Sequence, residues 1–311
     1  KYDVLIAGAG LVGLALAPAL VRAGLSVALA DRTGVAVPEW APAAEDWDTR
    51  VYAISPGSAA FLRALGAWQA LPPDRVAPVE AMRIEGDAGA LLNFSAYELG
   101  ERALAWIVEE RSLRAALVAL ARSAGVAIHA PCAFESLSFS GDAGLLRLAG
   151  DGSLAASLIV GADGVRSWVR DGAGIAAVVT PYRQTAVVAN FACERAHRGR
   201  AYQWFLDDGG ILAWLPLPGE RMSIVWSARD ELADELAALE PEDLARRVRD
   251  AGGAALGDLA LDSAVARFPL RVSERKLRRD ELDTALAEGD RRQGVFLYRP
   301  SCPTCSACEA I

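Results

Sequence analysis

The chain opens with Tyr2-Asp3-Val4-Leu5-Ile6-Ala7-Gly8-Ala9-Gly10-Leu11-Val12-Gly13, an apolar strand that runs into three spaced glycines. Gly8 permits a sharp turn from strand to helix, Gly10 lets a pyrophosphate approach the backbone, and Gly13 lets the helix pack closely on the strand. The N-terminus of that helix offers free N–H groups and the positive end of its dipole. The stretch therefore predicts a dinucleotide site, and the alternative is a glycine turn that only closes a tight loop.

The residues that follow complete the pattern of such a site. A helix is expected over Leu14 to Ala23 with Gly24 at its C-terminal end, and a second strand over Leu25 to Ala30. Asp31 ends that strand, eighteen residues after Gly13. An acidic side chain at this place accepts hydrogen bonds from a ribose.

Composition limits the class of protein. A chain of 311 residues buries a large core, and its 53% of apolar residues include no uninterrupted run long enough for a transmembrane helix. A net charge of −8 disfavours a nucleic-acid surface. The five cysteines do not form a secreted disulfide framework, and the first residues hold no basic leader. We expect a cytoplasmic protein.

A second motif, Gly161-Ala162-Asp163-Gly164-Val165-Arg166-Ser167, follows the apolar strand Leu158-Ile159-Val160. It brings a carboxylate and free backbone amides to the carboxyl end of a strand, where open α/β sheets bind ligands. The alternative is an aspartate that merely caps the helix of Ser167 to Arg170.

The rest of the chain alternates between helical and extended patterns. Helices are expected over Arg111 to Ala124 and within Glu231 to Ala251. Strands are expected over the following stretches: Val79 to Phe94, Val126 to Pro131, Phe134 to Ile159, and Gln184 to Ser227.

Three patterns together resemble the FAD-dependent aromatic hydroxylases, the group that includes the ubiquinone-biosynthesis monooxygenases. They are the opening glycine stretch with Asp31, the stretch Asp48-Thr49-Arg50-Val51-Tyr52-Ala53-Ile54-Ser55, and Gly161-Ala162-Asp163-Gly164 with Ser167 and Arg170. The similarity continues through Ile107-Val108-Glu109-Glu110-Arg111 and through Phe205 to Trp226, and it covers about residues 2–270.

The resemblance implies a Rossmann-like α/β FAD-binding domain of the glutathione-reductase type with an inserted antiparallel β-sheet domain for substrate. The FAD domain would take residues 1–72 and 100–178, and the sheet domain 73–99 and 179–270. The residues that it implies at the cofactor are Gly8, Gly10, Leu11, Val12, Gly13, Asp31, Arg32, Arg50, Arg111, Asp163 and Gly164. Arg50 would lie on the flavin side, Arg111 near the pyrophosphate, and Asp163 close to the cofactor.

The resemblance also implies an activity. NAD(P)H would reduce the flavin, and O2 would supply a hydroxyl group to a phenol or quinol ring, in ubiquinone biosynthesis. Tyr202, Trp204 and Trp214 are candidates for an apolar wall around a prenylated ring, against the alternative of ordinary sheet packing. Contact with the inner membrane or with a biosynthetic complex would suit such a substrate, and the oligomeric state stays open. The second enzymatic alternative is an FAD-dependent dehydrogenase or prenyl reductase.

After Phe268-Pro269-Leu270 the chain departs from this family. A strand with a Gly-Asp motif, a histidine-containing loop and a long helix are expected there, and residues 271–311 do not show them. We therefore expect FAD binding and hydroxylation to be weakened or absent. Cys302, Cys305 and Cys308 are spaced to converge on a metal ion or an iron–sulfur cluster, or they are free thiols.

Residues 271–311 resemble the N-terminal segment of arginyl-tRNA–protein transferases and their leucyl relatives. Phe296-Leu297-Tyr298-Arg299-Pro300 and the spaced cysteines carry this similarity. It suggests a junction near Phe268 to Arg271 and, as a third alternative function, a fragment of a tRNA-dependent aminoacyl transferase.

Overall fold

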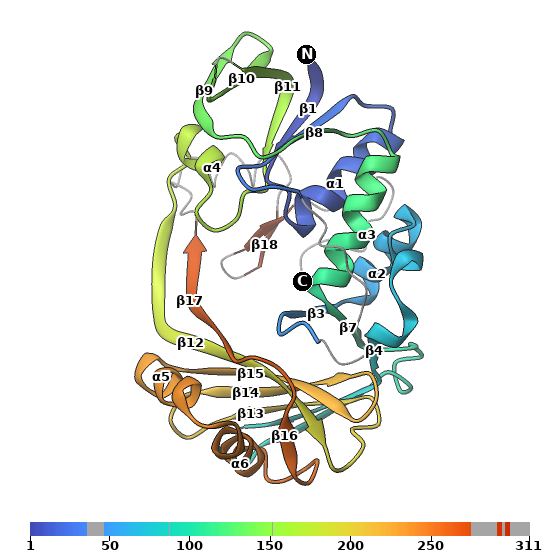
Figure 1. Ribbon diagram of the computed structural model, residues 1–311, viewed down its shortest axis with the longest axis vertical. Coiled ribbons are helices and arrows are strands. Elements are labelled where there is room, and N and C mark those ends of the chain that lie inside the picture. Colours follow the sequence, from blue (N-terminus) through green and yellow to red (C-terminus); the bar gives the residue numbers. More distant parts are fainter. Residues whose placement is uncertain (36–46, 87, 151, 275–290, 294–295, 299–311) are drawn as a thin grey trace.

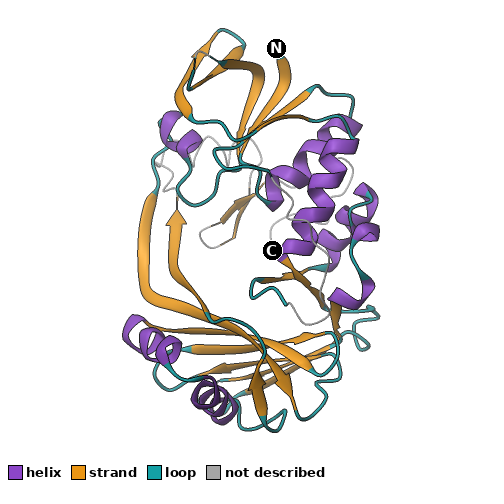
Figure 2. Cartoon of the chain, viewed as in Figure 1, coloured by secondary structure: helices purple, strands orange, loops and turns teal. Residues whose placement is uncertain are grey.

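The computed structural model describes residues 1–35, 47–86, 88–150, 152–274, 291–293 and 296–298. Its strands form two large sheets and two small ones. In the view of Figure 1 one large sheet lies in the upper layer and the other in the lower layer, and the small sheets lie between them. Figure 2 shows that helices cover the right side of the upper layer and the outer side of the large sheet in the lower layer.

The first sheet is built from the opening strand–helix–strand unit. Its order is β8-β2-β1-β11-β10-β9, with β8, β2, β1 and β11 parallel and the last two strands antiparallel. The strands are β1 (Tyr2–Ala7), β2 (Val27–Ala30), β8 (Ala127–His129), β9 (Phe134–Ser140), β10 (Ala143–Leu148) and β11 (Ser153–Gly161). Because β1 and β11 are neighbours, their carboxyl ends bring the two glycine motifs together.

Helices α1 (Leu11–Arg22) and α3 (Glu110–Ser123) pack on one face of this sheet. Leu14 and Ala17 of α1 and Leu117 and Ala121 of α3 meet Ile6 of β1 in one buried cluster. Gly24 and Gly125 follow the two helices with positive φ values, as their expected C-terminal positions require. Near them lie α2 (Pro56–Leu65), η1 (Trp68–Ala70) and η2 (Pro73–Arg75), whereas α4 (Trp168–Gly172) packs against β9 and β11.

The second sheet has the order β16-β12-β15-β14-β13-β5-β6, and β17 also pairs with β12. Its strands are β5 (Ala81–Glu85), β6 (Leu91–Ser95), β12 (Val178–Cys193), β13 (Arg200–Phe205), β14 (Ile211–Leu217), β15 (Arg221–Arg229), β16 (Leu259–Leu261) and β17 (Ala266–Glu274). Helices α5 (Asp230–Ala238) and α6 (Pro241–Ala251) cover its outer face. The helical pattern of residues 231–251 is thus two helices, because Pro241 starts the second one.

A small sheet joins the two layers. It has the order β3-β7-β4, and its strands are β3 (Val51–Ile54), β4 (Val76–Val79) and β7 (Ala105–Glu109). The second sheet is antiparallel except for the parallel pair β13–β5, and it is called the large antiparallel sheet below. Ile107 and Val79 of the small sheet pack against Ala201 and Leu217 of the large one, on the face that carries no helices. A further hairpin consists of β18 (Arg291–Gln293) and β19 (Phe296–Tyr298).

β17 runs without interruption from Ala266 to Glu274 and pairs with β12 at Phe268, Arg271 and Glu274. The junction expected near Phe268 to Arg271 therefore falls inside one strand. The three spaced cysteines lie outside the described residues. In the part of the chain that is described, no helix has the length and apolar character that a membrane crossing requires.

Candidate cofactor site

The glycine loop, residues 8–13, leaves the carboxyl end of β1 and enters α1. Gly8 has φ +112°, and a Cβ there would lie 2.7 Å from the backbone nitrogen of Asp163 and nearer still to the Ala162 carbonyl. A Cβ at Gly13 would approach the carbonyl oxygen of Gly8 to under 3.0 Å. The loop is therefore packed tightly on two sides, and only glycine fits at these two places.

Gly10, the remaining glycine of the loop, faces open space instead of the protein. A Cβ at Gly10 would meet no atom within 4 Å. Gly10 is the N-cap of α1, no side chain caps this helix, and its first turn, which is described in full, has no acidic residue. Uncapped N–H groups at a helix N-terminus with open space before them bind anions. Leu11 and the 72% exposed Val12 begin this helix beside that space. The residues present thus fit the pyrophosphate of a dinucleotide.

Asp31 stands at the end of β2 and holds the glycine loop. Its Oδ2 accepts a hydrogen bond from the Ala9 N–H at 2.5 Å, and its Oδ1 accepts from the N–H and Oγ1 of Thr33, each at 2.6 Å. Burial acts to raise the pKa of Asp31, but these hydrogen bonds outweigh it and hold the pKa below its usual value. The carboxylate therefore stays ionised, and its Oδ2 keeps one lone pair for a ribose hydroxyl. Arg32, next in sequence, is exposed.

Asp31→Asn is expected to lower the free energy of unfolding at neutral pH by about 1–2 kcal/mol, because the amide cannot accept as many hydrogen bonds as the carboxylate. The wild-type carboxylate has a lowered pKa, so its contribution is present above the ordinary aspartate pKa and is lost as the pH falls through the folded-state pKa. The variant should therefore lose less stability than the wild type between neutral and acidic pH, measured by urea unfolding at each pH. Equal losses would contradict the assignment.

Arg114 is a contact that the sequence did not single out. Its Nη1 donates to the carbonyl oxygen of Ala9 at 2.9 Å, so α3 supports the glycine loop from the side. The sequence could have indicated this residue, because Arg114 follows Arg111 by three positions and therefore lies on the same face of α3.

Asp163 caps α4, as the alternative interpretation of its motif had it. Ser167 Oγ donates to its Oδ1 at 2.5 Å, and the N–H groups of Trp168 and Val169 donate to its Oδ2 at 2.7 and 3.1 Å. Its backbone nitrogen faces Gly8, and the exposed Gly164 follows with φ +83°. The motif thus abuts the glycine loop through its backbone while its carboxylate serves the helix. Whether it contacts a cofactor stays a prediction.

Asp163→Ala should cost about 1 kcal/mol of stability, since a capping carboxylate is lost. Asp171→Ala is the control, because Asp171 also lies in α4 but its carboxylate contacts the Arg170 guanidinium beside it and not the first-turn N–H groups of the helix. Thermal unfolding of both variants checks the difference. A loss for Asp171→Ala as large as that for Asp163→Ala would argue against a capping role.

Arg111 and Arg50 lie where the two layers meet. The N–H of Arg111 donates to Asp48 Oδ2 at 2.9 Å, and its Nε lies 3.8 Å from the same oxygen. Arg50 Nε lies 2.9 Å from Glu110 Oε2, and its guanidinium lies over the ring of Phe268 in β17, 5.4 Å from the centroid. Their assignments to the pyrophosphate and the flavin stay predictions.

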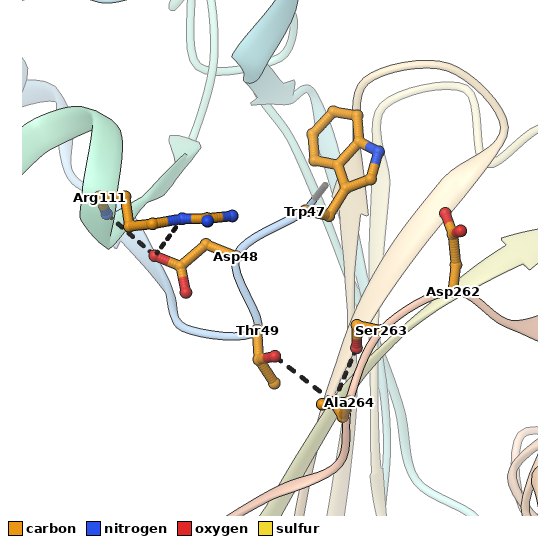
Figure 3. Close-up of a pocket in the computed structure, with 7 residues that line it drawn as sticks. All are labelled: Trp47, Asp48, Thr49, Arg111, Asp262, Ser263 and Ala264. Atoms are coloured by element: carbon orange, nitrogen blue, oxygen red, sulfur yellow. Dashed lines mark hydrogen bonds and ion pairs between the residues drawn. The ribbon is translucent and has the colours of Figure 1, made fainter. Parts of the chain in front are cut away.

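A pocket of about 420 Å³ opens at this junction. Figure 3 shows that one wall comes from the segment before β3 and the start of α3, and the other from the loop between β16 and β17. Its lining residues are Trp47, Asp48, Thr49, Arg111, Asp262, Ser263 and Ala264. The Asn190 side chain of β12 ties the walls together, because its Nδ2 donates to the Asp48 carbonyl at 3.0 Å and its backbone N–H donates to Ser263 Oγ at 2.9 Å.

A buried ion pair supports the first wall and was not anticipated. Arg75 and Glu109 are 3% and 2% exposed, and Arg75 Nη1 lies 3.4 Å from both carboxylate oxygens of Glu109. Glu109 Oε1 also accepts from the Asp48 N–H at 2.6 Å, and the Arg75 guanidinium lies over the Trp47 ring at 4.1 Å. Burial raises the pKa of Glu109, against the lowering effect of that hydrogen bond and of Arg75. A charged residue at the end of the apolar strand Ala105–Glu109 was the available signal.

The expected aromatic wall for substrate is not formed by the three residues named for it. Tyr202, Trp204 and Trp214 belong to the core between the large antiparallel sheet and the helices α5 and α6, and Trp214 packs against Gly252 at the end of α6. Side chains alternate along a strand, so the neighbours Ala201 and Leu215 face the pocket side instead. The prediction is wrong for these three residues, and ordinary sheet packing explains them.

The comparisons with known proteins identify the family of the chain. A family model described as FAD binding domain matches residues 1–280. The ubiquinone hydroxylase UbiL of Rhodospirillum rubrum is 36% identical over 253 residues, which cover 80% of this chain and 58% of that protein. Human mitochondrial ubiquinone biosynthesis monooxygenase COQ6 is 33% identical over 270 residues, and the match covers 80% of this chain and 56% of that protein. The chain thus spans less than two thirds of the length of these relatives.

Solved structures show the same fold. PqsL from Pseudomonas aeruginosa, described as a probable FAD-dependent monooxygenase, superposes with a TM-score of 0.68 at 23% identity over 86% of this chain and 73% of that one. Aklavinone-11 hydroxylase, in a ternary complex with FAD and aklavinone, gives 0.59 at 23% identity over 89% of this chain and 55% of that one. The expected architecture, an α/β FAD-binding fold with an antiparallel sheet, is confirmed.

Proposed function

This chain belongs to the FAD-binding domain family, and from that premise we propose that it carries the FAD site and the substrate site of a hydroxylase that acts on an aromatic quinone precursor. NAD(P)H would be the reductant and O2 the source of the hydroxyl oxygen. The observation that carries the proposal is the glycine loop, which presents the uncapped N-terminus of α1 and is packed directly against the Gly161–Gly164 motif. Relatives named as ubiquinone hydroxylases support the substrate class.

The chain's own residues divide the work. The glycine loop would hold the pyrophosphate, Asp31 the adenosine ribose, and Arg114 the loop itself. When bound, FAD supplies the redox chemistry between NAD(P)H and O2.

The reacting end belongs, in this proposal, at the junction of the two layers. Arg50 reaches Phe268 there, and the pocket beside it is walled by both layers. The face of the antiparallel sheet without helices would orient the substrate ring, since α5 and α6 occupy the other face.

The test is to titrate the purified chain with FAD and follow flavin absorbance, and then to supply NAD(P)H, a phenolic quinone precursor and ¹⁸O2. We expect weak but saturable FAD binding and one ¹⁸O atom in any hydroxylated product. Oxidation of NAD(P)H with an altered product that carries no ¹⁸O would favour the dehydrogenase or reductase alternative. Absence of FAD binding would overturn the proposal. The similarity of residues 271–311 to tRNA–protein transferases stays a prediction, which tRNA binding would test.

A further inference from the structure

The outer edge of the large antiparallel sheet is apolar and unprotected. β6 ends this sheet, and among the described residues it pairs only with β5. Leu91, Leu92 and Phe94 of β6 are 48%, 57% and 45% exposed, and Tyr97 and Leu99 just beyond it are 91% and 64% exposed. These five residues are called the β6 patch below.

The backbone at this edge has a defined set of outward groups. Gly86 N–H donates to the Ala90 carbonyl, and Ala96 N–H donates to the Glu80 carbonyl, so the even-numbered residues of β6 bond to β5. Bonding alternates along an antiparallel ladder. The N–H and C=O groups of Leu91, Asn93 and Ser95 are therefore directed away from β5, toward whatever lies beyond the edge.

Protein edges of this kind are usually guarded by charged side chains, proline or a bulge. No charged residue and no proline occurs from Ala88 to Tyr97, and the register of β5 with β6 runs without a shift. An edge without such protection is suited to pairing with another strand.

We propose that β6 pairs with β6 of a second copy of this chain, antiparallel and about a two-fold axis at Asn93. In this register Leu91 lies opposite Ser95 of the second copy and Asn93 opposite Asn93, so the outward groups of both strands satisfy each other. Leu92 lies opposite Phe94 of the second copy on the other face. The two copies thus bring four apolar side chains together, and no charge opposes a like charge.

A lipid surface fits these observations less well. The outward N–H and C=O groups would lose their water without gaining partners in hydrocarbon. The chain also carries a net charge of −8, and Glu98 lies between Tyr97 and Leu99 of the patch in sequence. Both charges disfavour binding to anionic lipid. Strand pairing satisfies both the backbone and the apolar side chains.

The experiment is sedimentation analysis of the full chain over a range of concentrations, with reductant present to exclude disulfide-linked species. We expect a dimer of the 32.8 kDa chain. Asn93→Pro removes an outward N–H, which an edge strand tolerates, and should abolish the dimer while circular dichroism and thermal unfolding of the monomer stay unchanged. Leu92→Lys should weaken the dimer by about tenfold or more, through loss of apolar contact.

Phe139→Lys is the matched control, because Phe139 is a 61% exposed aromatic residue on β9, the edge of the other large sheet. It should leave the dimer unchanged. A wild-type chain that stays monomeric at every concentration overturns the proposal, as does a dimer that survives Asn93→Pro. Hydrogen exchange gives an independent readout: the amides of Leu91, Asn93 and Ser95 should be protected in the dimer and exposed on dilution. Protection of these amides that does not change on dilution would also overturn it.

Discussion

Gly8→Ala is expected to abolish measurable FAD binding and to lower the free energy of unfolding by about 3 kcal/mol. The backbone at Gly8 has φ +112°, which L-residues rarely adopt, and the new Cβ would press on the Ala162 carbonyl and the Asp163 nitrogen. Both ways to relieve the clash, rotation of the loop or displacement of the Gly161–Gly164 motif, disturb the N-terminus of α1. Urea unfolding and a flavin absorbance titration measure the two effects.

Gly10→Ala is the matched control for this variant. Gly10 has φ −73°, which alanine adopts freely, and its Cβ would meet no protein atom within 4 Å. Stability should therefore stay within about 0.5 kcal/mol of wild type. FAD affinity should still fall by about tenfold or more, because the added methyl occupies the space through which the pyrophosphate approaches. If Gly10→Ala binds FAD as tightly as wild type, the open side of the loop is not the phosphate side.

Arg75→Met is expected to lower the free energy of unfolding by about 3–5 kcal/mol at neutral pH, because it leaves the carboxylate of Glu109 buried without its cation. Both side chains are 2% exposed in this pair. The same change should loosen Trp47 and Asp48, which Arg75 and Glu109 hold by ring stacking and by a hydrogen bond. Urea unfolding measures the first effect. Because the chain has eight tryptophans, the second is measured as the part of the tryptophan fluorescence that is lost in Trp47→Phe, compared with and without Arg75→Met.

The pH dependence gives this prediction a sign. The pKa of Glu109 is raised by burial, and a raised folded-state pKa means stability that is present at low pH and lost as the pH rises through that pKa. Removal of Arg75 raises this pKa further, so Arg75→Met should lose more stability at about pH 8 than at about pH 5. The double variant Arg75→Met, Glu109→Gln should recover most of the loss, because no buried charge remains. A double variant as unstable as Arg75→Met would show that the loss of stability comes from the space left by the smaller methionine side chain and not from the buried charge.

Local sequence patterns predicted many of the helices and strands of the upper layer, which holds the glycine loop. The strand–glycine–helix unit, the second strand ending at Asp31 and the helix stopped by Gly125 all follow from short-range rules of turn geometry and periodicity. These rules hold because backbone conformation at a glycine, and the apolar stripe of a helix, depend on neighbours within a few residues.

Local patterns did not determine which face of the large antiparallel sheet each side chain lies on. A strand presents alternate residues to opposite faces, and the sequence does not say which face a helix covers. The sequence of Tyr202, Trp204 and Trp214 is therefore compatible with a substrate wall as well as with core packing, and the packing of α5 and α6 decided for core.

By itself, the sequence determined the glycine loop, its following helix and the family to which they point, since each rests on residues adjacent in the chain. Only the tertiary structure decided what the loop touches: Asp31 and Arg114 hold it, the Gly161–Gly164 motif lies against it, and the Arg75–Glu109 pair supports the pocket wall. These partners are separated by tens of residues along the chain. Their contacts follow from parallel β1–β11 pairing and from the docking of two sheets, which no local pattern encodes.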